Sequence, residues 1–156
     1  MAIREATPAD ISSIYRLIVD LAIYEKEPDA VVATEEDLRT ALFGANPQVF
    51  CHVVEINSQV VGIAIWFLNF STWLGKHGIY LEDLYVDPKY RGQGWGFKLL
   101  QTLAQICVDR GYPRFQWWVL DWNQPSIEFY KAHGAVAMDE WTVYRVTGEE
   151  LKKLGS

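Results

Sequence analysis

Arg91-Gly92-Gln93-Gly94-Trp95-Gly96 is the stretch that decides how the rest of this sequence is interpreted. It stands between strand-forming residues 78–86 and a segment with helical periodicity, 94–110. Glycine at every second position permits a tight turn and leaves backbone N–H groups unobstructed. Those donors, with the positive end of the following helix, suit a pyrophosphate group. A glycine-rich turn without a ligand is the alternative interpretation.

Two common phosphate loops do not fit this stretch. The spacing of Gly92, Gly94 and Gly96 misses the dinucleotide pattern G-x-G-x-x-G, and the strand before it is not the first of a βαβ unit. No Gly-Lys-Ser/Thr follows, which excludes a nucleoside-triphosphate loop of the Walker type.

The remaining segments predict a mixed α/β layer fold in a single domain, residues 1–156. Strands are expected at 2–6, 50–56, 59–70, 78–86, 115–120 and 142–146, with Asn57-Ser58 forming a hairpin turn. Helices are expected after the capping sequences at Thr7 and Thr34, at 94–110 and at 126–133, with a terminal helical turn at 148–154.

Composition narrows the class of protein. The chain has 156 residues, half of them hydrophobic, and a formal charge of −6. The negative charge argues against nucleic-acid binding and favours cationic partners. No apolar run is long enough to span a bilayer, and the start of the chain does not resemble a secretory signal. Cys51 and Cys107 form no disulfide framework or metal spacing, so a reduced cytoplasmic protein is expected.

Arg91, Gly94 and Gly96 match the coenzyme A pyrophosphate motif Arg/Gln-x-x-Gly-x-Gly/Ala of the GNAT superfamily of N-acetyltransferases. Residues 123–130, Asn-Gln-Pro-Ser-Ile-Glu-Phe-Tyr, followed by Gly134, resemble the second half of the same signature. Residues 80–86, 21–25 and 73–76 resemble the diamine (spermidine/spermine-type) acetyltransferase branch. The segments follow the family's order across nearly the whole chain.

The resemblance implies a GNAT fold: a mixed, mostly antiparallel sheet flanked by helices, with coenzyme A bound where two strands splay. It implies acetyl-CoA as co-substrate, a small amine as substrate, and a homodimer. The cofactor-binding residues that it implies are Leu84, Tyr85, Val86, Arg91, Gly92, Gln93, Gly94, Trp95, Gly96, Phe97, Asn123, Pro125, Ser126 and Tyr130.

Three residues are the catalytic candidates. Adjacent strand residues Glu82 and Asp83 are expected to face opposite sides of the sheet, and the resemblance selects Glu82 as the base. It also implies that the backbone N–H of Leu84 stabilises the thioester oxygen. Tyr130 is the expected proton donor to the thiolate, since a phenol's pKa of about 10 lies above a thiol's 8.5. An exposed strand carboxylate and a packed helix tyrosine are the alternatives.

The candidates for binding the amine are Tyr24, Glu25, Glu82, Asp83 and Glu140. Glu25 is equally well explained as a solvated charge at a helix end. The tryptophans at 117, 118, 122 and 141 are better explained as core residues than as a cation-binding box. No metal site is expected, because His52, His77 and His133 share no ligand spacing.

The substrate is less well defined than the reaction. Lys26 and Pro28 dilute the acidic stretch after Tyr24, and Ala135 stands where many GNAT members have Phe. Polyamines such as spermidine or spermine are the first expectation, and thialysine or lysine-like amino acids are the second, because relatives in the same branch prefer them. Acetylation of protein amino groups and coenzyme A binding without catalysis are further alternatives.

Overall fold

The computed structural model describes residues 2–156, which form two compact units, residues 2–118 and 119–156. The prediction of one domain over the whole chain stays a prediction. Within residues 2–156, no helix combines the length and apolarity needed to cross a membrane.

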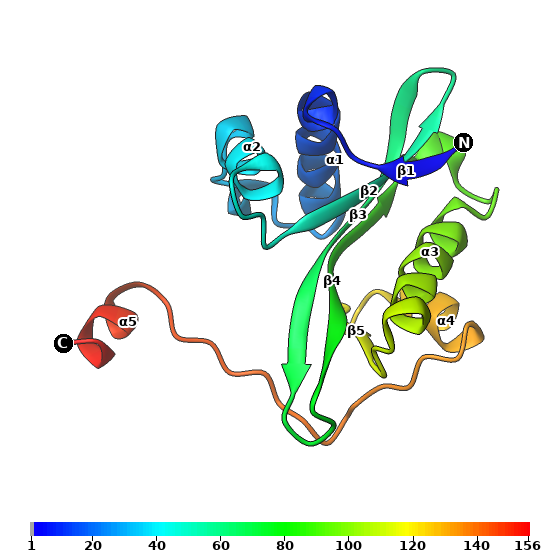
Figure 1. The fold of residues 1–156 in the computed structure, drawn as a ribbon. Coiled ribbons are helices and arrows are strands. Elements are labelled where there is room, and N and C mark those ends of the chain that lie inside the picture. Colours follow the sequence, from blue (N-terminus) through cyan, green and yellow to red (C-terminus); the bar gives the residue numbers. More distant parts are fainter. Residues whose placement is uncertain (1) are drawn as a thin grey trace. The chain divides into compact units, whose positions relative to one another are not determined.

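The first unit is built on a five-stranded sheet in the order β1-β2-β3-β4-β5 (Figure 1). Its strands are β1 Ile3–Glu5, β2 Phe50–Ile56, β3 Gln59–Ser71, β4 Lys76–Val86 and β5 Phe115–Trp117. Neighbouring strands are antiparallel except for β4 and β5, which are parallel. The expected mixed, mostly antiparallel sheet is confirmed. The hairpin turn is confirmed as well, with Asn57 and Ser58 both at positive φ, 49° and 64°, the geometry that matches the twist of paired strands.

Three helices of this unit cover the two faces of the sheet: α1 Ile11–Tyr24, α2 Glu35–Phe43 and α3 Trp95–Arg110 (Figure 1). A 3₁₀ turn, Pro8–Asp10, precedes α1, and a capping box of Thr34 and Asp37 begins α2. The apolar stripe of α1 packs on alternate residues of β2 and β3, and the buried set includes Ile11, Ile14, Leu17, Val53, Ile63 and Ile65.

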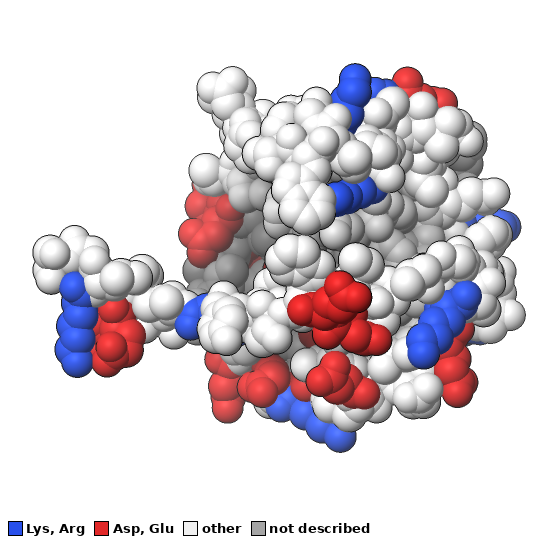
Figure 2. Space-filling model, turned by 90° about the horizontal axis from the view of Figure 1, so that it is seen from below, with Lys and Arg blue, Asp and Glu red and all other residues white. Residues whose placement is uncertain are grey.

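The second unit contains α4 Gln124–Ala132 and α5 Gly148–Leu154. Along α5, Lys152 pairs with Glu149 and Lys153 with Glu150. Blue and red side chains lie side by side on this helix in Figure 2.

The expected strand at 142–146 is wrong. These residues are not in a strand, and Val143 and Tyr144 are 56% and 91% exposed. β-propensity alone does not make a strand, because a strand needs a hydrogen-bonding partner and a face to bury. The expected strand 115–120 is also shortened, since β5 ends at Trp117.

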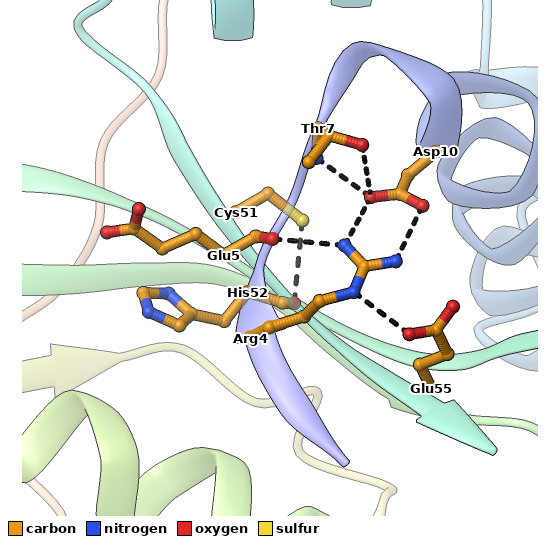
Figure 3. Close-up of polar contacts among 7 residues, drawn as sticks. All are labelled: Arg4, Glu5, Thr7, Asp10, Cys51, His52 and Glu55. Atoms are coloured by element: carbon orange, nitrogen blue, oxygen red, sulfur yellow. Dashed lines mark hydrogen bonds and ion pairs between the residues drawn. The ribbon is translucent and has the colours of Figure 1, made fainter. Parts of the chain in front are cut away.

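A partly buried ion pair fixes β1 to the start of α1 (Figure 3). Arg4 donates from Nη1 and Nη2 to the two carboxylate oxygens of Asp10 at 2.7 and 3.0 Å. Arg4 Nε also donates to Glu55 at 3.1 Å, and Asp10 accepts from the Thr7 N–H at 2.8 Å. The hydrogen bonds from Arg4, followed by the one from the Thr7 backbone, hold the pKa of the Asp10 carboxyl below its usual value.

We expect Asp10→Asn to lower the free energy of unfolding at pH 7 by about 2–4 kcal/mol, because Arg4 would lose its charged partner. Because the folded-state pKa of Asp10 is depressed, the wild-type advantage should be present at neutral pH and disappear as pH falls below about 4. Urea unfolding at several pH values measures this.

The control is Asp20→Asn, which removes a more exposed carboxylate 3.8 Å from Arg16. That change should cost less than about 1 kcal/mol. Equal stability of the two variants would contradict a structural role for the Arg4–Asp10 pair.

Candidate active site

The glycine-rich loop presents open backbone at the start of α3. Gly92 and Gly94 have φ of 76° and 83°, and a Cβ added at either would meet no atom within 4 Å. The helix begins directly after Gly94, which supplies no side-chain cap, and the Lys98 N–H donates to the Gly94 carbonyl at 3.0 Å. The earlier N–H groups of a helix have no intrahelical acceptor. The loop therefore fits an anionic group, as the sequence predicts.

Arg91 ties this loop to β4 and to the end of α1. Its Nε donates to the Val86 carbonyl at 2.9 Å, and its guanidinium carbon lies 5.1 Å from the Tyr85 ring centre and 5.5 Å from that of Tyr24. Tyr24, expected among the amine-binding residues, is thus in contact with the loop. Nothing in the sequence indicates this contact, because residue 24 is far from residue 91 along the chain.

Strands β4 and β5 separate within this unit. Their pairing covers only Ile79 to Leu81 of β4, opposite Phe115 to Trp117, whereas β4 stays paired with β3 as far as Val86. Residues 82–86 therefore have a strand partner on one side only. This is the splay that the resemblance implies.

One hydrogen bond shows in which direction the backbone N–H groups of residues 82–86 point. The Asp87 N–H donates to the Val61 carbonyl of β3 at 2.8 Å. Because backbone groups alternate in direction along a strand, the N–H groups of Tyr85 and Asp83 also point toward β3. Those of Leu84 and Val86 then point toward the side where β5 is no longer paired.

A β-bulge at Glu82 modifies the expected alternation of side chains. Ile65 pairs with Asp83 and the next residue, Trp66, pairs with Leu81, so Glu82 is the extra residue of β4. A bulge reorients the side chains around it. The expectation that Glu82 and Asp83 face opposite sides assumed a regular strand, so at this bulge it stays a prediction. The charge of Glu82 contributes to the raised pKa of Asp83.

Glu25, Glu82 and Asp83 form a cluster of carboxylates. Burial, with further contributions from Glu82 and Glu25, raises the pKa of Asp83 to about 7. Burial also raises the pKa of Glu25, and the charge of Glu82 adds to that shift. Burial, then Glu82 and Asp83, raises the pKa of Tyr80 to about 12. The cluster disfavours further negative charge and favours a bound cation.

The predicted site residues that follow Trp118 belong to the second unit. Asn123 is buried and caps α4, accepting from the Ser126 N–H at 3.4 Å, with Pro125 in the first turn. Tyr130 is half-buried on α4, and its ring centre lies 5.6 Å from that of Phe129. Glu140 is exposed in a turn. Their roles stay predictions from the sequence.

Metal chemistry has no support in the described part of the chain. No group of three or more His, Cys, Asp or Glu in residues 2–156 could hold a metal ion. Free Cys51 and Cys107 are buried, and burial raises the pKa of both thiols.

Comparison with known proteins decides the family. The model of the acetyltransferase (GNAT) family matches residues 12–135, which include the glycine-rich loop, the splayed stretch of β4 and α4. The chain belongs to the GNAT acetyltransferase family. It is accordingly an N-acetyltransferase that uses acetyl-CoA as co-substrate, and the open loop at Gly92 and Gly94 fits the pyrophosphate of that molecule.

Similar proteins include amine acetyltransferases. A thialysine N-epsilon-acetyltransferase of Sus scrofa is 42% identical, over 97% of this chain and 95% of its own length. A spermidine/spermine N(1)-acetyltransferase-like protein of Homo sapiens is 36% identical, over 96% of this chain but 23% of its own length. Among solved structures, an integron cassette protein from Vibrio cholerae has a TM-score of 0.83 and 27% identity, over 99% of this chain and 98% of its own. These similarities agree with the diamine acetyltransferase branch.

We expect Gly94→Ala to weaken coenzyme A binding by roughly tenfold or more, because the new Cβ enters the loop that accommodates the pyrophosphate. Calorimetric titration with coenzyme A measures this. Gly111→Ala is the matched control, since Gly111 ends α3 at a φ of 72° and also has no atom within 4 Å of an added Cβ.

Both variants carry a similar backbone cost of about 1–2 kcal/mol for a non-glycine residue at positive φ. Only the variant in the loop should lose affinity. Equal affinities would refute the assignment of this loop to the pyrophosphate.

Proposed function

We propose that this enzyme transfers the acetyl group to the distal amine of a small amino acid such as thialysine, and that polyamines are the second candidate. The observation that carries the proposal is the cluster of Glu25, Glu82 and Asp83, together with the similarity to thialysine N-epsilon-acetyltransferases over nearly the full length of both chains.

The protonation of the cluster favours a substrate with one ammonium near these carboxylates. With the pKa of Asp83 at about 7 and that of Glu25 raised, the cluster is not fully ionised at neutral pH. One ammonium near the cluster can be balanced by its partial negative charge. A polyamine brings several ammonium groups, and balancing them would need more ionised carboxylates than the cluster has. The positive charge of Lys26 offsets part of the negative charge that Glu27 and Asp29 would offer to a second ammonium.

Glu82 is the proposed base. A substrate amine with a pKa of about 10.4 is protonated at pH 7, and its neutral form costs roughly 4–5 kcal/mol. A carboxylate beside the ammonium binds the cation and takes up its proton, directly or through water. The free amine nitrogen then attacks the thioester carbonyl carbon, and the C–S bond breaks after the tetrahedral intermediate forms.

The remaining roles belong to the loop, the splayed strand and α4. The Leu84 N–H would stabilise the thioester oxygen. Residues 84–86 would pair with the pantetheine arm, and the N–H groups of residues 93–97 would bind the pyrophosphate. Tyr130 would give its proton to the departing thiolate, and Asn123 and Ser126 would contact coenzyme A.

We further propose that the enzyme is a cytoplasmic homodimer. The family resemblance supports the dimer. The two unbonded, buried cysteines, Cys51 and Cys107, suit a reducing compartment.

An amine panel tests the substrate. Thiol release from acetyl-CoA is measured with thialysine, lysine, ornithine, putrescine, spermidine, spermine and a peptide with a free N-terminus. We expect the highest kcat/KM with thialysine. Glu25→Gln should raise KM for spermidine more than for thialysine, because spermidine carries further ammonium groups and no carboxylate, whereas the α-ammonium of thialysine is balanced by its own α-carboxylate. A preference for spermidine would establish the polyamine alternative, and turnover of the peptide alone would refute both.

The pH–rate profile of Glu82→Gln tests the base. At pH 7, kcat/KM should fall by about a hundredfold or more, and it should recover partly as pH rises toward the amine pKa of about 10.4. Glu36→Gln, which changes an exposed carboxylate on α2, should leave the profile unchanged. Parallel profiles for wild type and Glu82→Gln would exclude Glu82 as the base.

A further inference from the structure

An open cleft of about 490 Å³ lies between the β1–β2 edge of the sheet and the C-terminal part of α3. This volume is within the range of small-molecule sites, about 300–1,000 Å³. Its lining residues are Glu5, His52, Gln101, Thr102, Gln105, Ile106 and Arg110.

His52 directs a hydrogen-bond donor into this cleft. The residue is 7% exposed, and its Nδ1 accepts from the indole N–H of Trp66 at 3.1 Å. An Nδ1 that accepts carries no hydrogen, so in the neutral ring the proton is on Nε2. Burial lowers the pKa of His52, which keeps the ring neutral at pH 7. Within residues 2–156, the Nε2–H of His52 has no acceptor.

The cleft also carries one negative and one positive group that do not pair with each other. Glu5 lies directly opposite His52 across the β1–β2 ladder, and the two side chains extend to the same side, away from Arg4 and Asp10 (Figure 3). Arg110, the last residue of α3, places its guanidinium carbon 5.9 Å from the ring centre of Trp66. In the described part of the chain, neither Glu5 nor Arg110 forms an ion pair.

We propose that this cleft binds a small zwitterion, an α-amino acid in its ionised form. Its carboxylate would accept from the Nε2–H of His52 and from Arg110, and its ammonium would pair with Glu5. A simple carboxylate would leave Glu5 without a partner, and a simple amine would leave Arg110 and the His52 donor without one. Ile106 supplies an apolar wall for the ligand's side chain.

The cleft is separate from the acetyl-transfer site. Cys51 and His52 are adjacent on β2 and therefore face opposite sides of the sheet. Cys51, Ile65 and Asp83 are cross-strand neighbours, so Asp83 belongs to the face opposite His52. Along α3, Gln105 lies about 16 Å from Gly94 at 1.5 Å per residue. A ligand in the cleft therefore occupies neither the glycine-rich loop nor the carboxylate cluster.

The test uses three probes of similar shape without acetyl-CoA, so that no turnover occurs. L-leucine carries both charges, L-leucinamide only the ammonium, and 4-methylpentanoate only the carboxylate. The readout is the indole N–H resonance of Trp66 in proton–nitrogen NMR spectra, since that group donates to His52. We expect leucine to shift this resonance with a Kd on the order of 1 mM, and the other two probes to bind at least tenfold more weakly. No saturable shift with leucine, or equal affinity for all three probes, would overturn the proposal.

Two exposed side chains provide the variants, each with a matched control. Arg110→Gln and Glu5→Gln should each weaken leucine binding by about tenfold, because each removes one charged partner. Arg39→Gln and Glu36→Gln change an exposed pair on α2 and should leave the affinity unchanged. Undiminished leucine binding by both cleft variants would overturn the assignment. Loss of leucine binding in these variants would support the assignment, whether or not the amine substrate is the one proposed above.

Discussion

The backbone of β4 loses its hydrogen bonding to β5 at Glu82, and the predicted site depends on this loss of pairing. Up to Leu81 the strand is paired on both sides, and beyond Glu82 it is paired only with β3. Before the bulge, odd-numbered residues such as Ile79 direct their N–H groups toward β5. Because the bulge inserts one residue, even-numbered residues such as Leu84 do so after it. The end of pairing with β5 leaves backbone donors and acceptors open along this edge, and the extra residue determines that Leu84 and Val86 are the donors.

Much of this fold follows from local sequence signals. Asn57-Ser58 identifies the hairpin, and Thr34 with Asp37 identifies the start of α2. The glycine spacing at 92–96 predicts a phosphate loop, and the open backbone at Gly92 and Gly94 is compatible with one. In each case the residues of one short segment determine its conformation, through a helix cap or through residues that adopt a positive φ. The strand expected at 142–146 failed because its β-forming residues need a partner that no local signal provides.

The site was harder to predict where it depends on contacts between distant segments. The resemblance selected Glu82 and Leu84, but strict alternation of Glu82 and Asp83 assumed a regular strand, and a bulge is set by the pairing of Ile65 and Trp66 on another strand. The contact of Tyr24 with Arg91 likewise joins the end of α1 to a loop after β4. Periodicity describes one element at a time, so it gives neither the bulge nor this contact.

The raised pKa values of Asp83 and Glu25 bear directly on how an amine is recognised. Burial disfavours the charged form of the Asp83 carboxyl, whose pKa is about 7, so this group is partly protonated at neutral pH while the site is empty. An arriving ammonium reverses this preference, so binding of the cation and release of a proton from the cluster are linked. The proton released from Asp83 leaves a second carboxylate near Glu82, the proposed base, and this added negative charge favours transfer of the ammonium proton to Glu82. Recognition of the cation and proton transfer to Glu82 would then both depend on the burial of Asp83.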